Sequence, residues 1–193
     1  MKPIQYTSLF LLAIVALTAC SRKKDTFLNK KFHAVSTEYN TLFNGNNAFI
    51  QGKEAIAQTY RDDFYQILPV ERIEVVDLDG FDTDSKDPNF NKAEEKAVKA
   101  IQKHSMYIGG KEYNPQIDEA YMLLGKARYY DNRFIPALDA FNFILNKSAT
   151  SNNVNNAKIW KAKTNIRLKN EDYAIENLQK MLREENLEDA VVA

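Results

Sequence analysis

The C-terminal half of the chain contains an internal repeat, and this repeat constrains the fold more than any other feature of the sequence. Residues 120–145 match residues 157–182 without a gap, at an offset of 37, with small residues on small ones and apolar on apolar. Ala120 meets Ala157, for example, and Ala137 meets Ala174. Self-similarity at a period of roughly 20 to 50 residues is typical of arrays in which each unit buries its apolar face against the next. The repeat therefore predicts stacked pairs of helices over residues 91–193.

The first copy resembles a tetratricopeptide repeat. That motif has a large residue, a Leu-Gly pair and an aromatic on its first helix, and Ala, an aromatic and an apolar residue on its second. The matching residues here are Tyr121, Leu124, Gly125, Tyr129, Ala137, Phe141 and Ile144. In the second copy, Lys161 replaces the Leu and Ala162 replaces the Gly, and the other packing positions hold Trp160, Ala174 and Leu178. We expect the small residues to lie where paired helices cross and the large ones to fill the gap to the next pair.

Turn signals divide this half of the chain. Asp131-Asn132-Arg133 predicts a tight turn between the two helices of the first copy, and 148–156 predicts a longer loop before the second. Residues 92–107 predict one more helix, the second of a degenerate preceding unit, which Gly109-Gly110 ends. Residues 184–193 begin what reads as a further helix, without a polar capping helix after it. Either another chain covers the open end of the array or the chain is the N-terminal piece of a longer protein, and we favour the second.

Residues 31–69 predict a separate helical hairpin. Apolar residues recur at spacings of three and four, which indicates the inner face of a first helix; they are Phe32, Val35, Tyr39, Leu42 and Phe43. Asn44-Gly45-Asn46 predicts a turn, and a second helix follows until Pro69.

Residues 70–90 predict an acidic linker, rich in Asp between residues 77 and 87. A calcium-binding loop is the alternative, but it requires Gly at the sixth position and Glu at the twelfth. With Asp77 as the first position, those places hold Asp82 and Pro88, so the pattern fails. The predicted fold is all-α: a helical hairpin, an acidic linker and a tetratricopeptide-type α-solenoid.

The first twenty residues predict a lipoprotein signal. Lys2 is followed by an apolar run, 9–16, that is too short to span a bilayer, and Leu17-Thr18-Ala19-Cys20 resembles the bacterial lipobox. Such a cysteine is acylated and becomes the new N-terminus, so residues 1–19 are the signal peptide and 20–30 the lipidated Cys20 with its tether. An ordinary signal peptide with a chance cysteine is less favoured, because Cys20 is the only cysteine in the chain.

Charge and residue types indicate no chemistry of their own. The 26 basic and 26 acidic residues balance, so no strongly basic face indicates nucleic acid. A local basic cluster follows the anchor and suits a tether near lipid headgroups; it comprises Arg22, Lys23, Lys24, Lys30 and Lys31. The two histidines, His33 and His104, fit no metal-ligand or nucleophile–base pattern. We therefore expect no catalytic residue, no metal and no cofactor.

Three stretches resemble the tetratricopeptide-repeat lipoproteins of the gliding-motility and type IX secretion system of the Bacteroidetes, in their N-terminal portion. They are residues 41–45 with the following helix, residues 92–106, and residues 133–138 with 158–168. The resemblance implies a lipoprotein of the outer membrane that faces the periplasm and acts as a scaffold. Its implied partners are other proteins of the secretion and motility machine, and the membrane through the lipid on Cys20.

Two other functions remain open. A glycan-binding lipoprotein with tetratricopeptide helices would need aromatic side chains exposed on loops, whereas the Tyr and Phe residues here fall mainly at core spacing. A lipoprotein that assembles outer-membrane proteins has similar repeats. The stretch 92–106 argues against both, and an enzyme is the least favoured class.

Overall fold

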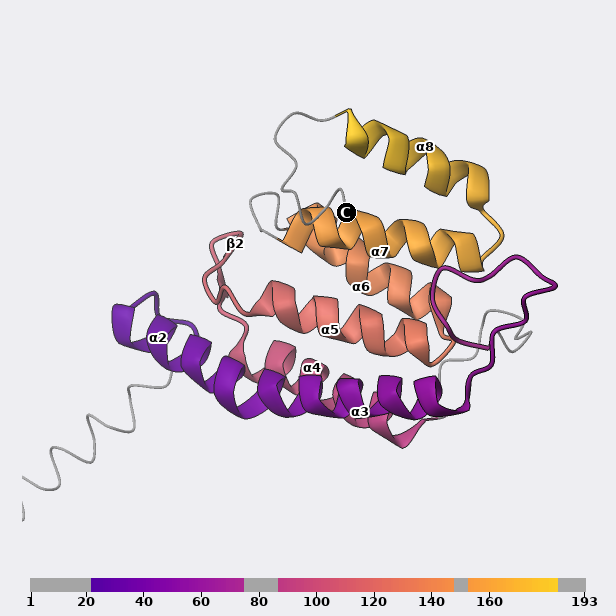
Figure 1. Cartoon of the computed structure of the whole chain (residues 1–193). Coiled ribbons are helices and arrows are strands. Elements are labelled where there is room, and N and C mark those ends of the chain that lie inside the picture. Colours follow the sequence, from indigo (N-terminus) through magenta and orange to yellow (C-terminus); the bar gives the residue numbers. More distant parts are fainter. Residues whose placement is uncertain (1–21, 75–86, 148–152, 184–193) are drawn as a thin grey trace, which may run out of the picture.

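A computed structural model describes residues 22–74, 87–147 and 153–183, and its fold is all-α, as predicted (Figure 1). The helical elements are α2 (Phe27–Ser36), η1 (Thr37–Leu42), α3 (Phe43–Thr59), α4 (Pro88–His104), α5 (Ile117–Tyr130), α6 (Phe134–Lys147), α7 (Asn153–Arg167) and α8 (Glu171–Leu182). A short antiparallel hairpin joins α4 to α5 and consists of β1 (Tyr107–Ile108) and β2 (Lys111–Glu112). Within the described ranges, no helix combines the length and the apolar character that crossing a bilayer requires.

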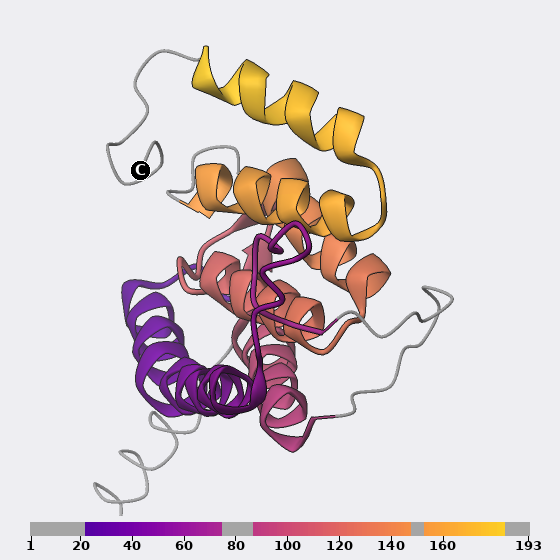
Figure 2. The ribbon, with the colours of Figure 1, turned by 45° about the vertical axis from the view of Figure 1, so that its right-hand side comes forward.

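The helices stack in chain order. α3 packs on α4, α4 on α5, α5 on α6, α6 on α7 and α7 on α8. Figure 1 shows this stack rising from α3 and α4 to α8, and Figure 2 shows the same layers after rotation. The two sequence copies become the pairs α5–α6 and α7–α8, so the prediction of paired helices is confirmed.

The predicted hairpin at residues 31–69 is wrong, because one unbroken helical run, α2–η1–α3, extends from Phe27 to Thr59. Gly45 lies inside this run and allows another helix to approach closely. A Cβ there would lie 2.7 Å from Leu123 Cδ2 and 3.0 Å from Lys96 Cβ. The long helix pairs with α4, so among the described residues the stack begins at α2 and residues 31–59 belong to it rather than to a separate hairpin domain.

The inner face of the long helix is polar and small. Asn29, His33, Thr37 and Thr41 are buried at intervals of four residues. In an α-helix, residues spaced by four rotate around the helix axis by about 40° at each step, because a turn takes 3.6 residues. η1 is a π-helix, whose i→i+5 bonds hold more residues per turn and so keep the series facing α4. The apolar residues assigned above to the inner face are exposed instead: Phe32, Val35, Tyr39 and Phe43. Leu42 alone of that set is buried.

The boundaries of the predicted linker also change. Asp87 is the N-cap of α4, accepting hydrogen bonds from the backbone N–H of Asn89 (2.7 Å) and Phe90 (3.1 Å). Pro88 is the first helical residue, where its missing N–H costs nothing. The helix ends at His104 rather than at residue 107. Most of the Asp-rich run, with the rejected calcium loop, lies outside the described residues, as do Cys20 and residues 184–193.

The predicted turns after α4 and α5 are present. Gly109 and Gly110 have φ of +58° and +86°, and Asn132 has φ of +61°. The turn at Asn132 is anchored by a buried ion-pair network: Arg133 binds Asp131 (3.0 Å) and Glu94 of α4. This network fixes α4 against the junction of α5 and α6.

Candidate functional site: a groove lined by α3, α5 and α7

One face of the stack is formed by the first helices of the three pairs. α5 contacts α3 on one side and α7 on the other, so side chains from all three helices meet across α5. We call this surface the groove. Its residues are Asn46, Phe49 and Lys53 on α3, Met122, Lys126 and Tyr130 on α5, and Trp160, Lys163 and Arg167 on α7.

Lysine ammonium groups and aromatic rings alternate in the groove. Lys126 Nζ and Lys163 Nζ lie 5.3 Å and 4.8 Å from the centroid of the Trp160 ring, within the range of cation–π attraction. Lys53 Nζ lies 5.2 Å from the Tyr130 ring centroid. Lys126 and Lys163 are 37 residues apart and thus occupy equivalent positions in the two repeats. Burial, together with the charges of Lys53 and Lys163, lowers the pKa of Lys126.

Residues 60–74 cross one end of the groove, and we call this segment the strap. Figures 1 and 2 both show it rising from the end of α3 past the ends of α5 and α7. Glu71 accepts hydrogen bonds from Tyr130 Oη at 2.7 Å and from Lys163 Nζ at 2.5 Å. Arg167 donates to the backbone carbonyl of Glu71. The carboxylate and the backbone carbonyl of Glu71 are therefore bound by side chains of α5 and α7.

The strap also inserts an apolar side chain. Ile73, two residues after Glu71, is 3% exposed and packs in the cluster that contains Phe90, Tyr130 and Phe134. The predicted linker is therefore anchored to the stack where it begins. Between these anchors and α3, the strap leaves Phe64 and Tyr65 largely exposed.

The electrostatics of the anchor favour an ionised Glu71. Burial alone would raise the pKa of Glu71, but the hydrogen bonds from Lys163 and Tyr130, with the charges of Lys163 and Lys53, outweigh burial, so the pKa is lowered. Burial and the Glu71 carboxylate raise the pKa of Tyr130. The Tyr130 hydroxyl therefore stays a proton donor at neutral pH.

The other end of the groove is open. A cavity of about 160 Å³ lies between α3, α5 and the start of α7. It is lined by Asn46, Phe49, Glu119, Met122, Leu123, Lys126 and Asn153. No described carboxylate lies within ion-pair distance of Lys126 or Lys53. The open end can thus accept an acidic group from outside the described chain.

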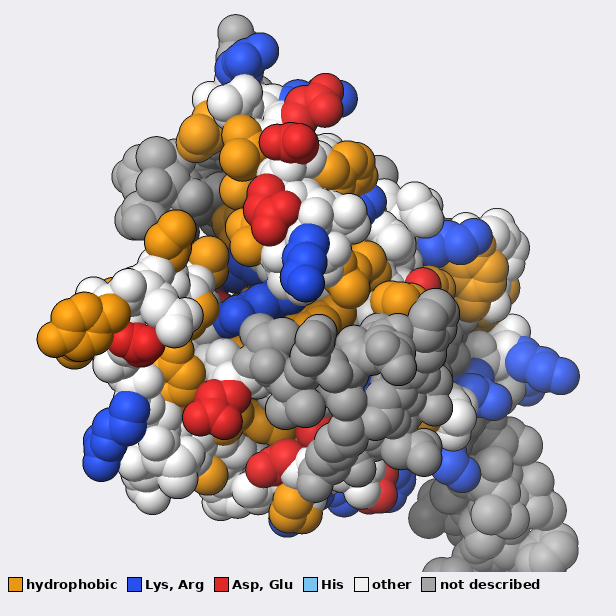
Figure 3. Space-filling view, turned by 90° about the vertical axis from the view of Figure 1, so that its right-hand side faces the viewer, with side chains coloured by type: hydrophobic (Ala, Val, Ile, Leu, Met, Phe, Trp, Pro, Cys, Tyr) orange, Lys and Arg blue, Asp and Glu red, His pale blue; other side chains and the backbone are white. Residues whose placement is uncertain are grey.

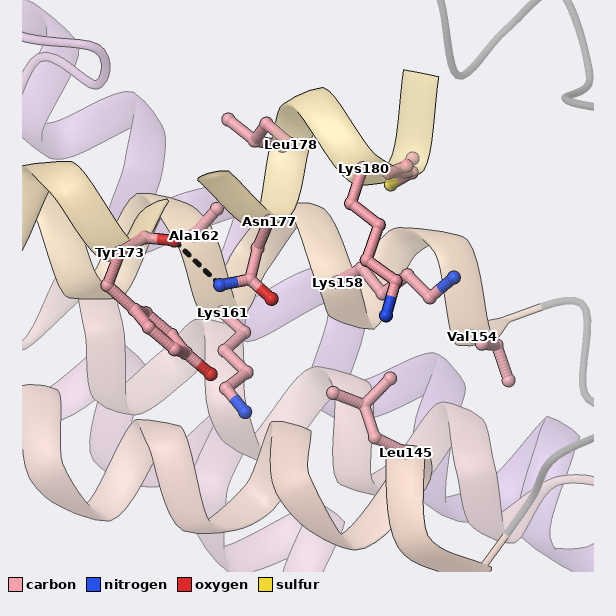
Figure 4. Close-up of a pocket in the computed structure, with 10 residues that line it drawn as sticks. Leu145, Val154, Lys158, Lys161, Ala162, Tyr173, Asn177, Leu178 and Lys180 are labelled. Atoms are coloured by element: carbon pink, nitrogen blue, oxygen red, sulfur yellow. Dashed lines mark hydrogen bonds between the residues drawn. The ribbon is translucent and has the colours of Figure 1, made fainter. Parts of the chain in front are cut away.

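A second hollow, of about 330 Å³, lies between α7, α8 and the end of α6 (Figure 4). Lys158, Lys161 and Lys180 line it together with Tyr173. Lys161 Nζ lies 5.8 Å from the Tyr173 ring centroid, and Asn177 Nδ2 donates to the Tyr173 carbonyl (2.6 Å). This hollow belongs to the last described pair and involves none of the strap's anchors.

The strap end of the stack carries charges of both signs. Figure 3 views the end of the stack at which the strap lies, and acidic and basic side chains are interspersed there with hydrophobic ones.

The two histidines meet between α2 and α4. His33 Nδ1 lies 3.1 Å from His104 Nδ1, and their ring centroids are 5.4 Å apart. Burial, His33 and the cations Arg22, Lys99 and Lys103 lower the pKa of His104. Across the described ranges, no three His, Cys, Asp or Glu side chains are grouped so that they could hold a metal ion. The contact joins two helices in a cationic setting.

The sequence-predicted packing residues lie mainly inside the stack. Leu124, Gly125, Tyr129, Ala137, Phe141, Ile144, Ala162 and Ala174 are buried, whereas Tyr121, Trp160 and Leu178 are half-buried. Tyr121 stacks on Phe143 with ring centroids 3.7 Å apart. Trp160 lies at the edge of the groove, so it serves both the core and the candidate site. Cys20 lies outside the described residues.

Sequence reasoning missed the groove lysines and the strap. The available signal for the lysines was the match of Lys126 with Lys163 at the repeat offset, although a charge at an equivalent position ordinarily indicates only a solvated face. For Glu71 and Ile73 no local signal exists, because their partners lie tens of residues away along the chain.

No protein-family model matches the chain, and no curated protein matches it.

Proposed function

We propose that this protein is a scaffold that binds other proteins through the groove, and that it acts in type IX secretion and gliding motility. One observation carries the binding part of the proposal: the groove already holds a non-helical segment of the chain, through Glu71 and Ile73 of the strap. A partner segment with an acidic residue and an aliphatic residue two places on would meet the same chemistry. Lys126 at the open end and Lys53 over the Tyr130 ring offer positive charge for further acidic groups.

The cellular part of the proposal depends on the resemblance to the secretion lipoproteins. In this proposal Cys20 carries the lipid, the mature chain is anchored in the outer membrane, and the groove faces the periplasm. The paired helices are compatible with tetratricopeptide repeats, and arrays of such repeats bind other proteins on a concave surface. No step of catalysis is part of this function.

The test is made in the host cell. Deletion of the gene is expected to remove proteins that bear type IX sorting domains from the medium and to accumulate them inside the cell. The double variant Lys53→Ala/Lys126→Ala is expected to reproduce the loss. Lys92→Ala, which changes an exposed lysine on α4, is the matched control and should secrete normally. Unchanged secretion after deletion would refute the assignment to type IX secretion.

A glycan-binding lipoprotein is the second candidate, and one observation favours it. Phe64 and Tyr65 of the strap are 80% and 101% exposed, so aromatic rings do lie free on a loop, where a sugar could stack on them. If deletion leaves secretion intact but abolishes growth on one polysaccharide, and Phe64→Ala/Tyr65→Ala does the same, this candidate replaces the first.

A further inference from the structure

The outer face of the long helix carries an unpartnered apolar stripe. Its members are Leu28, Phe32, Val35, Tyr39, Phe43 and Ile50, each between 48% and 70% exposed. They recur mostly at spacings of three and four, on the side opposite the buried Asn29, His33, Thr37 and Thr41. At 1.5 Å per residue the stripe is about 33 Å long. Soluble monomers rarely expose an apolar surface this continuous, so something covers it.

The charges near the stripe indicate what kind of surface covers it. Between residues 22 and 50 the chain has five basic residues and two acidic ones, Asp25 and Glu38. The basic residues cluster at and just before the start of the helix, and one acidic residue is neutralised there, since Asp25 pairs with Lys30. An amphipathic helix with Phe, Leu and Tyr on one face and lysines beside it is typical of helices that lie in the headgroup region of a bilayer. Anionic headgroups attract such lysines.

The short separation between Cys20 and α2 also favours a membrane surface. Phe27 follows Cys20 by seven residues, which span at most about 25 Å when fully extended. A lipid on Cys20 would therefore hold the start of α2 close to the membrane surface. This step depends on the anchor of the proposed function, whereas the exposure of the stripe does not.

The geometry points to a membrane-contact surface: the stripe of α2, η1 and α3 lies in the headgroup region of an anionic bilayer, with Lys24 and Lys31 contacting the headgroups. The stack then stands on the membrane along its first helix. α8, at the opposite end of the stack, is held away from the surface (Figure 1).

Spin labels test this contact in the lipidated protein, reconstituted in vesicles of phosphatidylethanolamine and phosphatidylglycerol. Cys20 is the only cysteine, so acylation leaves an introduced cysteine as the only free thiol. Phe32→Cys and Tyr39→Cys place the label on the stripe, and Lys92→Cys places it on the exposed side of α4 as the control. Accessibility is measured to oxygen, which concentrates in lipid, and to a water-soluble nickel complex.

Labels on the stripe are expected to be several-fold more accessible to oxygen than to the nickel complex, relative to the control label. Equal exposure of stripe and control labels to the nickel complex would place the stripe in water and overturn the inference. Protection from both reagents would show that protein covers the stripe, a second copy or a partner, and would overturn it as well. Mass spectrometry of the purified protein reports the lipid on Cys20 separately, so failure of the anchor is distinguishable from failure of the contact.

Discussion

Gly125 marks the closest approach between α5 and α6, and replacing it with alanine tests how tightly the stack is packed. An added Cβ would lie 2.4 Å, 2.6 Å and 2.8 Å from three atoms of the Phe141 ring, whereas ordinary contacts begin at 3.4 Å. The ring would have to move by about 1 Å. Phe141 is fully buried and stacks against Trp160, so that movement displaces further core residues.

Two opposing free energies decide the result. Alanine is favoured over glycine in a helix interior by about 1 kcal/mol. Overpacking a core costs about 1–3 kcal/mol, and a contact this short belongs at the upper end of that range. We therefore expect Gly125→Ala to lower the free energy of unfolding by about 1–2 kcal/mol. For a chain of this size the melting temperature should fall by about 5 °C.

The assay is urea unfolding of the purified protein, followed by far-UV circular dichroism. Phe141→Leu removes the atoms that clash, at its own cost in lost packing. In the double variant Gly125→Ala/Phe141→Leu the new methyl group occupies the vacated space, so the combined loss should be smaller than the sum by about 1 kcal/mol. Asn47→Ala, on the exposed side of α3, measures the effect of helix propensity alone. A stabilised Gly125→Ala protein, or strictly additive losses in the double variant, would refute the reasoning.

Two further predictions concern titratable groups. Glu71→Gln removes the ion pair with Lys163, and we expect backbone hydrogen exchange in residues 60–74 to quicken about tenfold. Because the folded chain lowers the pKa of Glu71, docking of the strap is strongest above the unfolded value of about 4.3 and weakens as the pH falls through the folded value. The protection factor of the wild-type strap, which is the intrinsic exchange rate at each pH divided by the observed rate, should thus fall in acid; an identical fall in Glu71→Gln would argue against this anchor. The pKa of His104 is also lowered in the folded chain, so the unfolded chain binds the proton more tightly and stability should fall as the pH drops below about 6.5. His104→Gln should flatten the dependence of melting temperature on pH in that range, and an unchanged slope would exclude the titration of His104 as its source.

The sequence predicts the second half of the fold better than the first, and the reason is physical. α5 to α8 repeat one pattern of small and large residues, so each copy supports the assignment of the other. Gly109-Gly110 and Asn132 mark turns because the backbone there needs positive φ. Gly45 also resembles a turn residue in the sequence, but it lies inside a helix and allows a neighbouring helix to approach closely. Only the position of Leu123 in the fold shows this.

The long helix was misassigned because its apolar stripe faces outward. Phe32 and Tyr39 have the spacing of a core face, and the residues that do face α4 are polar or small, such as Asn29 and Thr37. The π-helical segment that keeps Thr37 and Thr41 on the inner side is not encoded in any simple period. The groove could not be predicted, because its contacts join residues far apart in the sequence. In the sequence Glu71 is part of an acidic linker, and only the fold places Tyr130 and Lys163 beside it.

The strap is part of the same chain as the groove, and this connection determines how easily another ligand can displace it. A tethered ligand acts at an effective concentration that is typically on the order of millimolar for a short linker. An isolated peptide of the same chemistry, added at micromolar concentration, would lose that competition even with an equal intrinsic affinity. A partner that is itself held at the same site by a second contact would compete at a comparable local concentration. A partner would then enter the groove only after it is already held by another contact, since only such a partner could displace the strap. Binding in the groove would therefore follow assembly of the complex.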